Sequence, residues 1–443
     1  MTHRPAILSI DALLFTLLVG AYVPLRFILL LPQLVPGQPA LTATLLLGVG
    51  VYWLIDLIGA QKDPAPRWVN RGKWLLIALA ITLITIGPLL MIVFVRHQSV
   101  PYQYAHDGLI QNEIAVRFVL DGKNPYVENY LNTPMAQAPF KVGNLTENPA
   151  LHYYAYLPLT FLLPLPFQAL AEGTIGWFDQ RFLHVFLFIA VLALAASLVT
   201  KPVHRLIVTM ILGLNPLFVS YLIEGRNDVV TLFWIVLTVA LLLKRRVMAS
   251  AIVFAVACAT KHTAWFFAPF YFVYISGAGL FAERLARIRR PLIAFVVVWA
   301  LIMLPWIVWD AGAFFEDTFG ALMGVTQYGA PIEGLGFGGW LLSLGIVTSP
   351  AAPFDFWIFQ LITCVPLLAI LLRRQWRANH IGTAVTGYGL LLFVFMFFSR
   401  LFNDNYVGFL VALLAVAGLM DRPDEHVMRE TPCPNGGAEW GKT

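Results

Sequence analysis

The chain has 443 residues, of which 59% are hydrophobic and only 12% are charged. A soluble domain usually carries about 25% charged residues, and a soluble fold of this length could not hide so much apolar surface from water. The net charge of +5 is small and gives no indication of a nucleic-acid partner. The composition therefore predicts an integral membrane protein that contacts membrane lipids.

Apolar runs of about 17–25 residues are candidate transmembrane helices. Two shorter segments, 157–171 and 336–348, are ambiguous, and the prolines of 157–171 lead us to expect a re-entrant segment there. We expect an all-α integral membrane protein of about twelve transmembrane helices, within a range of 11–14, plus interfacial helices in the first large outer loop. The twelve runs lie at 6–31, 40–60, 74–95, 180–200, 203–222, 227–243, 247–260, 264–280, 291–309, 355–372, 381–399 and 403–420.

Charge predicts the orientation. Five short connections are basic, and the positive-inside rule places them in the cytoplasm. The segment 310–335 carries acidic residues and no Lys or Arg, so we expect it outside the cell together with the long loop 96–156. One transmembrane domain over 1–420 in the plasma membrane, with both termini cytoplasmic and a disordered tail over 421–443, satisfies these assignments.

The long loop contains one predicted helix that begins near Asp107. Ile110, Ile114 and Phe118 recur every four residues and form one apolar stripe, which is typical of a short helix lying in the membrane interface. Asp107 at its start is either a helix cap, a role that Asp often has, or a general base at the lip of a membrane cavity. The two roles are compatible, and Asp107 is the predicted catalytic residue.

Polar neighbours of Asp107 are candidates for substrate binding. His106 either hydrogen-bonds the substrate or is an ordinary surface residue, and Glu113 and Arg117 have the spacing of an i,i+4 ion pair. Asn124-Pro125 predicts a turn after the helix. The candidates in this part of the chain are His106, Gln111, Glu113, Lys123, Asn124 and Tyr126.

Ionisable residues also lie at the outer ends of predicted spans, where such residues usually face a cavity. Lys261 interrupts an apolar stretch and needs a counter-charge, either a protein carboxylate or a ligand phosphate. Arg400 is either a headgroup anchor or a phosphate ligand, and Asp228 either caps a helix or binds substrate. We expect a lipid phosphate to bind Lys261, His262 and Arg400. Further substrate-binding candidates are Glu224, Arg226, Asn227 and Asp228.

These motifs follow one another in an order that resembles the GT-C superfamily of membrane glycosyltransferases, most of all the branch around family 87 and related mannosyltransferases. The resemblance rests on His106-Asp107-Gly108, on the turn 122–126, on 224–228 and on Lys261, and it covers roughly 74–280. It implies a polyprenyl-phosphate sugar as donor, and it places Asp107 at the family's catalytic acidic position. Two features depart from the pattern: two spans precede the span that leads into the loop, and Tyr156-Leu157-Pro158 stands where many relatives have Tyr-Pro-Pro.

The expected function is therefore inverting transfer of a sugar, such as mannose, to a glycan, lipid or protein acceptor outside the cytoplasm. Asp107 would act as the base, and Lys261 or Arg400 would stabilise the leaving phosphate. The alternatives are a transporter or flippase of lipid-linked or small solutes, a polymerase or ligase of lipid-linked glycans, and a non-catalytic subunit. No carboxylate cluster or cysteine pattern has metal-ligand spacing, so we expect no cofactor and no metal site, with dependence on a divalent metal left open.

Overall fold

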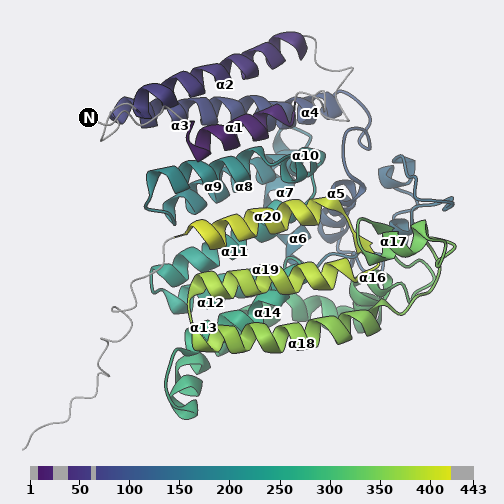
Figure 1. The fold of residues 1–443 in the computed structure, drawn as a ribbon. Coiled ribbons are helices and arrows are strands. Elements are labelled where there is room, and N and C mark those ends of the chain that lie inside the picture. The colour runs from purple at the N-terminus through teal and green to yellow at the C-terminus, as the bar shows by residue number, and fades with distance from the viewer. Residues whose placement is uncertain (1–7, 23–37, 61–65, 421–443) are drawn as a thin grey trace, which may run out of the picture.

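The computed structural model describes residues 8–22, 38–60 and 66–420 (Figure 1). Over these residues the chain is almost entirely helical, and its only strands form one parallel pair, in which β1 (Glu333–Gly334) lies beside β2 (Leu401–Phe402). The expected all-α class is confirmed. The expected cytoplasmic tail, 421–443, lies outside the described residues.

The first helices form a layer on one side of the bundle, where α1 and α3 pack on α9 (Pro202–Leu214) (Figure 1). A buried ion cluster holds this layer together: Nζ of Lys73 lies 2.6 Å from Asp11 and 2.5 Å from Asp56, and the Tyr52 hydroxyl donates to Asp11. The layer comprises α1 (Ile10–Gly20), α2 (Gln38–Ala60), α3 (Arg67–Ile81), η1 (Thr82–Ile86) and α4 (Gly87–His97).

The centre of the bundle is formed by helices that are short and apolar. The chain turns at Asn215, whose side chain caps the helix that begins at Pro216, and at Gly225, which has a positive φ of 94° and ends that helix. The central elements are α8 (Arg181–Ser197), α9 (Pro202–Leu214), α10 (Pro216–Glu224), α11 (Asp228–Leu243), α12 (Val247–Cys258), η4 (His262–Phe267), α13 (Ala268–Ser276), α19 (Ile381–Phe397) and α20 (Asp404–Leu419).

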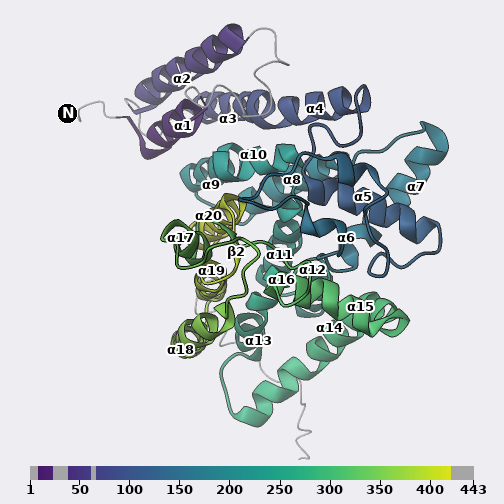
Figure 2. The same ribbon diagram turned by 90° about the vertical axis from the view of Figure 1, so that its right-hand side faces the viewer.

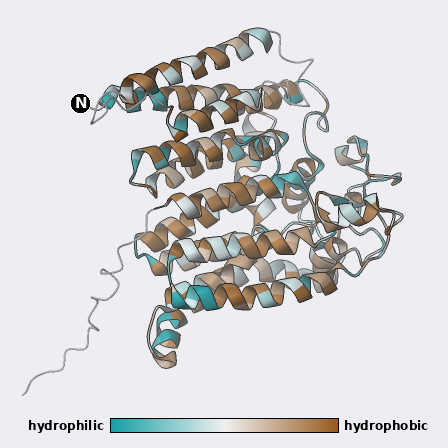
Figure 3. Ribbon diagram, viewed as in Figure 1, coloured by the Kyte–Doolittle hydropathy of each residue, from teal (hydrophilic) through white to brown (hydrophobic). Residues whose placement is uncertain are grey.

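Two long helices, α14 (Phe281–Trp309) and α18 (Phe356–Arg377), lie at the side of the bundle opposite to α2 (Figure 1). Their outward faces are apolar: Leu301 is 70% exposed and Val308 is 80% exposed. Figure 3 shows the same hydrophobic colouring along most of the helices. Apolar side chains directed away from the protein are what a lipid environment requires, because hydrocarbon offers polar groups no partner.

Within the residues that the structure describes, four helical segments are long and apolar enough to cross a membrane: Pro39–Ala60, Arg67–His97, Phe281–Trp309 and Phe356–Arg377. A fifth would be the pair Pro202–Leu214 and Pro216–Glu224, bent by 45°. The structure thus has the helices of a membrane protein, but it does not support the twelve full-length spans that we expected. A hydropathy pattern does not detect the turns that interrupt an apolar run. Six of the helices within the expected spans are only 10–17 residues long.

The two ambiguous segments are short helices. The segment 157–171 is broken between α6 (Leu159–Leu162) and α7 (Leu165–Thr174), as its prolines predicted, and 336–348 contains only α17 (Phe337–Ser343). The remaining elements are α5 (Asp107–Leu120), η2 (Pro134–Gln137), η3 (Pro149–Leu151), α15 (Ala311–Phe315), η5 (Glu316–Gly320) and α16 (Ala321–Met323).

Loops gather at one end of the bundle. Figure 2 faces this end and shows α5 on one side, α17 on the other and α16 between them. Beneath α5 lies a separate apolar core that includes Ile110, Ile114, Tyr154 and Trp306. The predicted apolar stripe of α5 is therefore confirmed, and it packs on the aromatic side chains of the loop that follows.

Candidate functional site

The helix α5 begins at Asp107, as predicted, but the capping residue is His106. The His106 backbone is extended, and its Nδ1 atom accepts a hydrogen bond from the Gly108 N–H. The His106 N–H donates to the carbonyl of Glu224 at 2.9 Å, which fixes the start of α5 against the end of α10. Asp107 thus occupies the first helical position, where the helix dipole favours a negative charge.

The Asp107 carboxylate is held by three neighbours. Its Oδ2 atom accepts a hydrogen bond from the Asn148 side-chain amide at 2.9 Å, and Oδ1 accepts from the Gly108 N–H and lies 2.9 Å from Nδ1 of His106. Burial alone would raise the pKa of Asp107, but His106, Asn148 and Gly108 together hold this pKa well below its usual value. The Asp107 side chain is 31% exposed.

Tyr156 packs directly on the first turn of α5. A Cβ atom at Gly108 would overlap the Tyr156 hydroxyl, so only glycine fits at this position. Burial raises the pKa of Tyr156, and Asp107 and Asp228 raise it further while Arg226 lowers it. The Tyr156 phenol therefore lies within the electrostatic influence of Asp107 and of the charged residues at the ends of α10 and α11.

Those charged residues form a paired cluster. Nζ of Lys261 lies 2.5 Å from Oδ1 of Asp228 and donates to Asn227 at 3.2 Å. Oδ2 of Asp228 accepts a hydrogen bond from the Asn405 amide at 2.6 Å, and Asn405 accepts one from Arg226 at 3.0 Å. The counter-charge of Lys261 is therefore a protein carboxylate, which was one of its two expected partners, the other being a ligand phosphate.

Two neighbours complete this region. Arg226 lies 3.4 Å from Glu224 and covers the Tyr221 ring. His262 follows Lys261 and contacts the rings of Trp265 and Phe319, and its buried Nε2 atom has no hydrogen-bond partner among the described residues.

Arg400 lies elsewhere, at the wall of a cavity among the loops at this end of the bundle. It is 4% exposed, and its guanidinium donates to the carbonyls of Ala330, Pro350 and Ala352. It is not exposed as a headgroup anchor would be. Within the described part of the chain, none of the ion pairs includes Arg400, and burial lowers its pKa. A buried cation without a carboxylate is suited to binding an anion.

The cavity has a volume of about 200 Å³ and lies between the segments 145–149 and 324–329. Asn148 connects it to α5, since its two chain neighbours line the cavity while its own amide donates to Asp107. Tyr153 gives a second connection. Burial raises the pKa of Tyr153, Asp107 raises it further, and Arg400 lowers it, so this phenol lies within the electrostatic influence of both groups.

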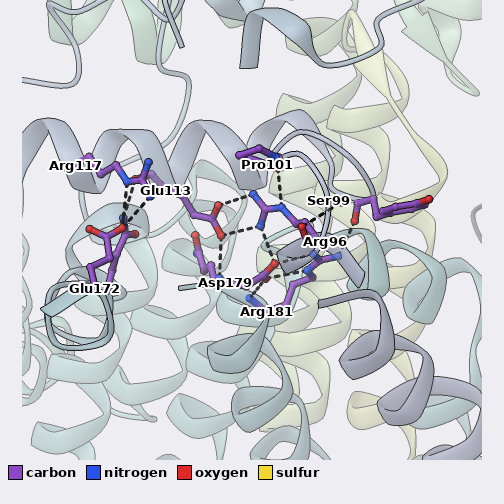
Figure 4. A network of polar contacts seen from close by, with 11 residues as sticks. Arg96, Ser99, Pro101, Glu113, Arg117, Glu172, Asp179 and Arg181 are labelled. Carbon is purple, nitrogen blue, oxygen red and sulfur yellow. Dashed lines mark hydrogen bonds and ion pairs between the residues drawn. The ribbon is translucent and has the colours of Figure 1, made fainter. Parts of the chain in front are cut away.

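Two other candidates on α5 have structural partners. Nε2 of Gln111 donates to the carbonyls of Ala150 and Tyr153 at 2.7 Å each, which holds the returning loop against α5. Glu113 lies 2.7 Å from Arg96, which also contacts Asp179 at 2.7 Å (Figure 4).

The expected ion pair between Glu113 and Arg117 is therefore wrong. Arg117 instead pairs with Glu172 of α7 at 3.0 Å (Figure 4). Spacing along one helix indicates which side chains share a face, but here both partners come from other segments, and the buried Arg96 offers Glu113 a less solvated contact.

The turn after α5 is also structural. Asn124 is buried and accepts a hydrogen bond from the Tyr126 N–H, and the Tyr126 hydroxyl donates to the Tyr156 carbonyl. Lys123 is half exposed and lies 3.7 Å from Glu128. None of these three candidates lines the cavity beside Arg400.

No sequence pattern singled out Asn148, Tyr153 or Asp317 as a site residue. Asp317 lies in the π-helical turn η5, and its carboxylate accepts a hydrogen bond from the Tyr154 N–H at 2.8 Å. Burial raises the pKa of Asp317 to about 8, the Tyr154 N–H opposes this shift, and Glu316 adds to it. The acidic, Lys- and Arg-free composition of 310–335 was the available signal for Asp317.

In the described part of the chain, no three His, Cys, Asp or Glu side chains are grouped so that they could hold a metal ion. No protein family, curated protein or solved structure matches this chain.

Proposed function

We propose that the protein is a membrane glycosyltransferase of the GT-C type, which transfers a hexose such as mannose from a polyprenyl-phosphate donor to an acceptor outside the cytoplasm. One observation carries the proposal: an ionised, partly exposed carboxylate, Asp107, is hydrogen-bonded to Asn148, and the chain neighbours of Asn148 line a polar cavity whose wall also contains Arg400.

The proposed reaction is a single displacement. The acceptor hydroxyl oxygen forms a bond to the anomeric carbon, the bond from that carbon to the phosphate oxygen breaks, and its electron pair leaves with the phosphate. Asp107 orients the hydroxyl and accepts its proton. Because the low pKa of Asp107 makes it a weak base, its proton transfer is late, and its main contribution is to orient the hydroxyl and stabilise the developing positive charge.

Arg400 is the best-supported phosphate ligand among the cations that we considered. Lys261 is neutralised by Asp228, and Arg226 is shared between Glu224 and Asn405. The guanidinium of Arg400 has five N–H donors, and three protein carbonyls accept from it. Donors fixed in advance near a leaving phosphate stabilise its charge without reorganisation during the reaction.

The proposal includes the orientation given by charge: twelve crossings, with both termini in the cytoplasm and the loops around α5 and α16 outside. The helices that are shorter than a bilayer cross as parts of a bundle whose outer helices contact lipid. Labelling of single cysteines from outside intact cells tests the sidedness. Asn144→Cys should react with a membrane-impermeant maleimide and Arg246→Cys should not, and the reverse pattern would contradict the orientation.

The activity is tested with purified full-length protein, radiolabelled polyprenyl-phosphate mannose or glucose, and envelope membranes as the source of acceptors. We expect sugar transfer that falls by about 10²–10⁴-fold in Asp107→Asn and by a similar factor in Arg400→Gln. Arg117→Gln, an exposed outer-loop variant, should retain activity. Uptake or flipping of the donor without transfer would favour a transporter, and transfer of whole glycans would favour a ligase.

A further inference from the structure

The cavity beside Arg400 is built from polar groups on two outer segments. Thr146 and Glu147 lie on one side, and Thr326, Gln327 and Tyr328 lie on the other. Hydroxyl, amide and carboxylate groups around one small space are suited to a ligand that carries several hydroxyl groups.

The volume of the cavity limits the size of this ligand. An apolar cavity of about 150 Å³ holds one benzene ring, so the present 200 Å³ can hold one six-membered ring with its substituents. A chain of sugars would have to extend out of the cavity. The cavity therefore fits one sugar unit, with whatever is attached to that unit lying outside it.

The charged side chains at the cavity wall favour one orientation of the ligand. Arg400 lies at one part of the wall, and the Glu147 carboxylate lies at another, 3.3 Å from His152. The His152 ring stacks on the Tyr328 ring at a centroid distance of 3.5 Å, which joins the two sides of the cavity. A sugar phosphate matches this arrangement when its phosphate contacts Arg400 and its hydroxyls contact Glu147 and Gln327.

We propose that this cavity binds the single sugar ring of the donor, with Glu147 and Gln327 selecting the sugar through its hydroxyl groups. The inference rests on the proposed function for the source of the sugar. The binding chemistry, one hexose bearing a phosphate at its anomeric carbon, can be measured independently of any transfer.

Titration calorimetry on the purified full-length protein tests the proposal, with mannose 1-phosphate, glucose 1-phosphate, galactose 1-phosphate and inorganic phosphate as probes. At least one hexose 1-phosphate should bind about tenfold more tightly than inorganic phosphate, since each well-placed hydroxyl contact contributes about that factor. Glu147→Gln and Gln327→Ala should weaken hexose 1-phosphate binding by about tenfold and leave phosphate binding unchanged, whereas Arg400→Gln should weaken both.

Glu128→Gln is the matched control, because Glu128 is another outer-loop carboxylate that does not line the cavity. Unchanged unfolding temperatures would show that each variant is folded. Hexose 1-phosphates that bind no better than phosphate, or a Glu147→Gln variant that binds like Glu128→Gln, would overturn the proposal.

The two proposals fail in different ways. Hexose 1-phosphate binding that depends on Glu147, in a protein without transfer activity toward any donor, would support the cavity and contradict the glycosyltransferase. Transfer whose choice among mannosyl, glucosyl and galactosyl donors does not change in Glu147→Gln or Gln327→Ala would support the glycosyltransferase and contradict the sugar site.

Discussion

Asn148 and Asp107 are separated by 41 positions in the chain, and the Asn148 side-chain amide donates a 2.9 Å hydrogen bond to Oδ2 of Asp107. This bond connects the first residue of α5 with the loop that lines the cavity. A hydrogen bond donated to a carboxylate stabilises its charged form, so this bond also favours ionised Asp107. The geometry of the proposed base therefore depends on a residue far away in the sequence.

The first prediction concerns the pH dependence of transfer. Asn148→Ala removes one donor from the ionised form of Asp107, so the pKa of Asp107 should rise. The acidic limb of the pH–rate profile should then move to higher pH than in the unmodified protein. Asn144→Ala is the control, since Asn144 is exposed in the same loop and makes only a 3.4 Å contact with Ser349. An acidic limb that stays in place would show that Asn148 does not act through Asp107.

A second prediction concerns the buried pair of Lys261 and Asp228. Lys261→Met leaves the Asp228 charge unpaired, which should lower the free energy of unfolding by about 3–5 kcal/mol. The double variant Lys261→Met/Asp228→Asn should recover most of this loss, as measured by thermal unfolding in detergent. Lys123→Met should cost less than about 1 kcal/mol, because Lys123 is half exposed.

Donor binding separates the structural role of Lys261 from a role in phosphate binding. The double variant should retain the donor affinity of the unmodified protein, because Arg400 is the proposed phosphate ligand. A large loss of donor affinity in a variant with normal stability would assign Lys261 to the phosphate after all.

The network around Arg96 provides a third prediction. Arg96→Met leaves the Glu113 carboxylate without its cation, beside an Asp179 carboxylate that keeps its pair with Arg181, so stability should fall by several kcal/mol. Arg117→Met removes an ion pair whose cation is 58% exposed, and the change should be within about 1 kcal/mol. Equal losses in the two variants would contradict the view that Arg96 anchors α5 to the bundle.

Asp317 makes stability depend on pH. Its pKa is about 8 in the folded protein against an ordinary 3.8, so the folded state binds more protons than the unfolded state between these values. Stability should therefore fall as the pH rises from about 4 to about 8. Asp317→Asn should flatten this part of the curve in thermal unfolding measured across pH. Asp310→Asn is the control, because Asp310 is exposed, and an equal flattening there would count against Asp317.

A fifth prediction tests the close approach of Tyr156 to α5. Gly108→Ala should lower transfer activity and stability, because the added Cβ overlaps the Tyr156 hydroxyl. The double variant Gly108→Ala/Tyr156→Phe should recover part of the stability, since it removes that oxygen. Gly173→Ala in α7, where the Cβ meets no atom within 4 Å, should be neutral or slightly stabilising. If the double variant recovers no stability, the overlap with the Tyr156 hydroxyl is not the cause of the loss.

The sequence by itself determined the class of protein, the start of α5 and the position of Asp107. Each of these follows from local properties: apolar runs long enough for a bilayer, a four-residue period and an acidic residue ahead of it. Local pattern also predicted the break in 157–171, because proline acts on its own backbone and on the preceding turn.

Only the tertiary structure decided which groups pair with the charged side chains. Lys261 pairs with Asp228, Glu113 pairs with Arg96, and Arg117 pairs with Glu172. Arg400 instead donates hydrogen bonds to backbone carbonyls at the wall of a cavity. The physical reason is that a buried charge takes whichever opposite charge or dipole the packing brings near it. Those partners come from segments distant in the chain, so no local spacing encodes them.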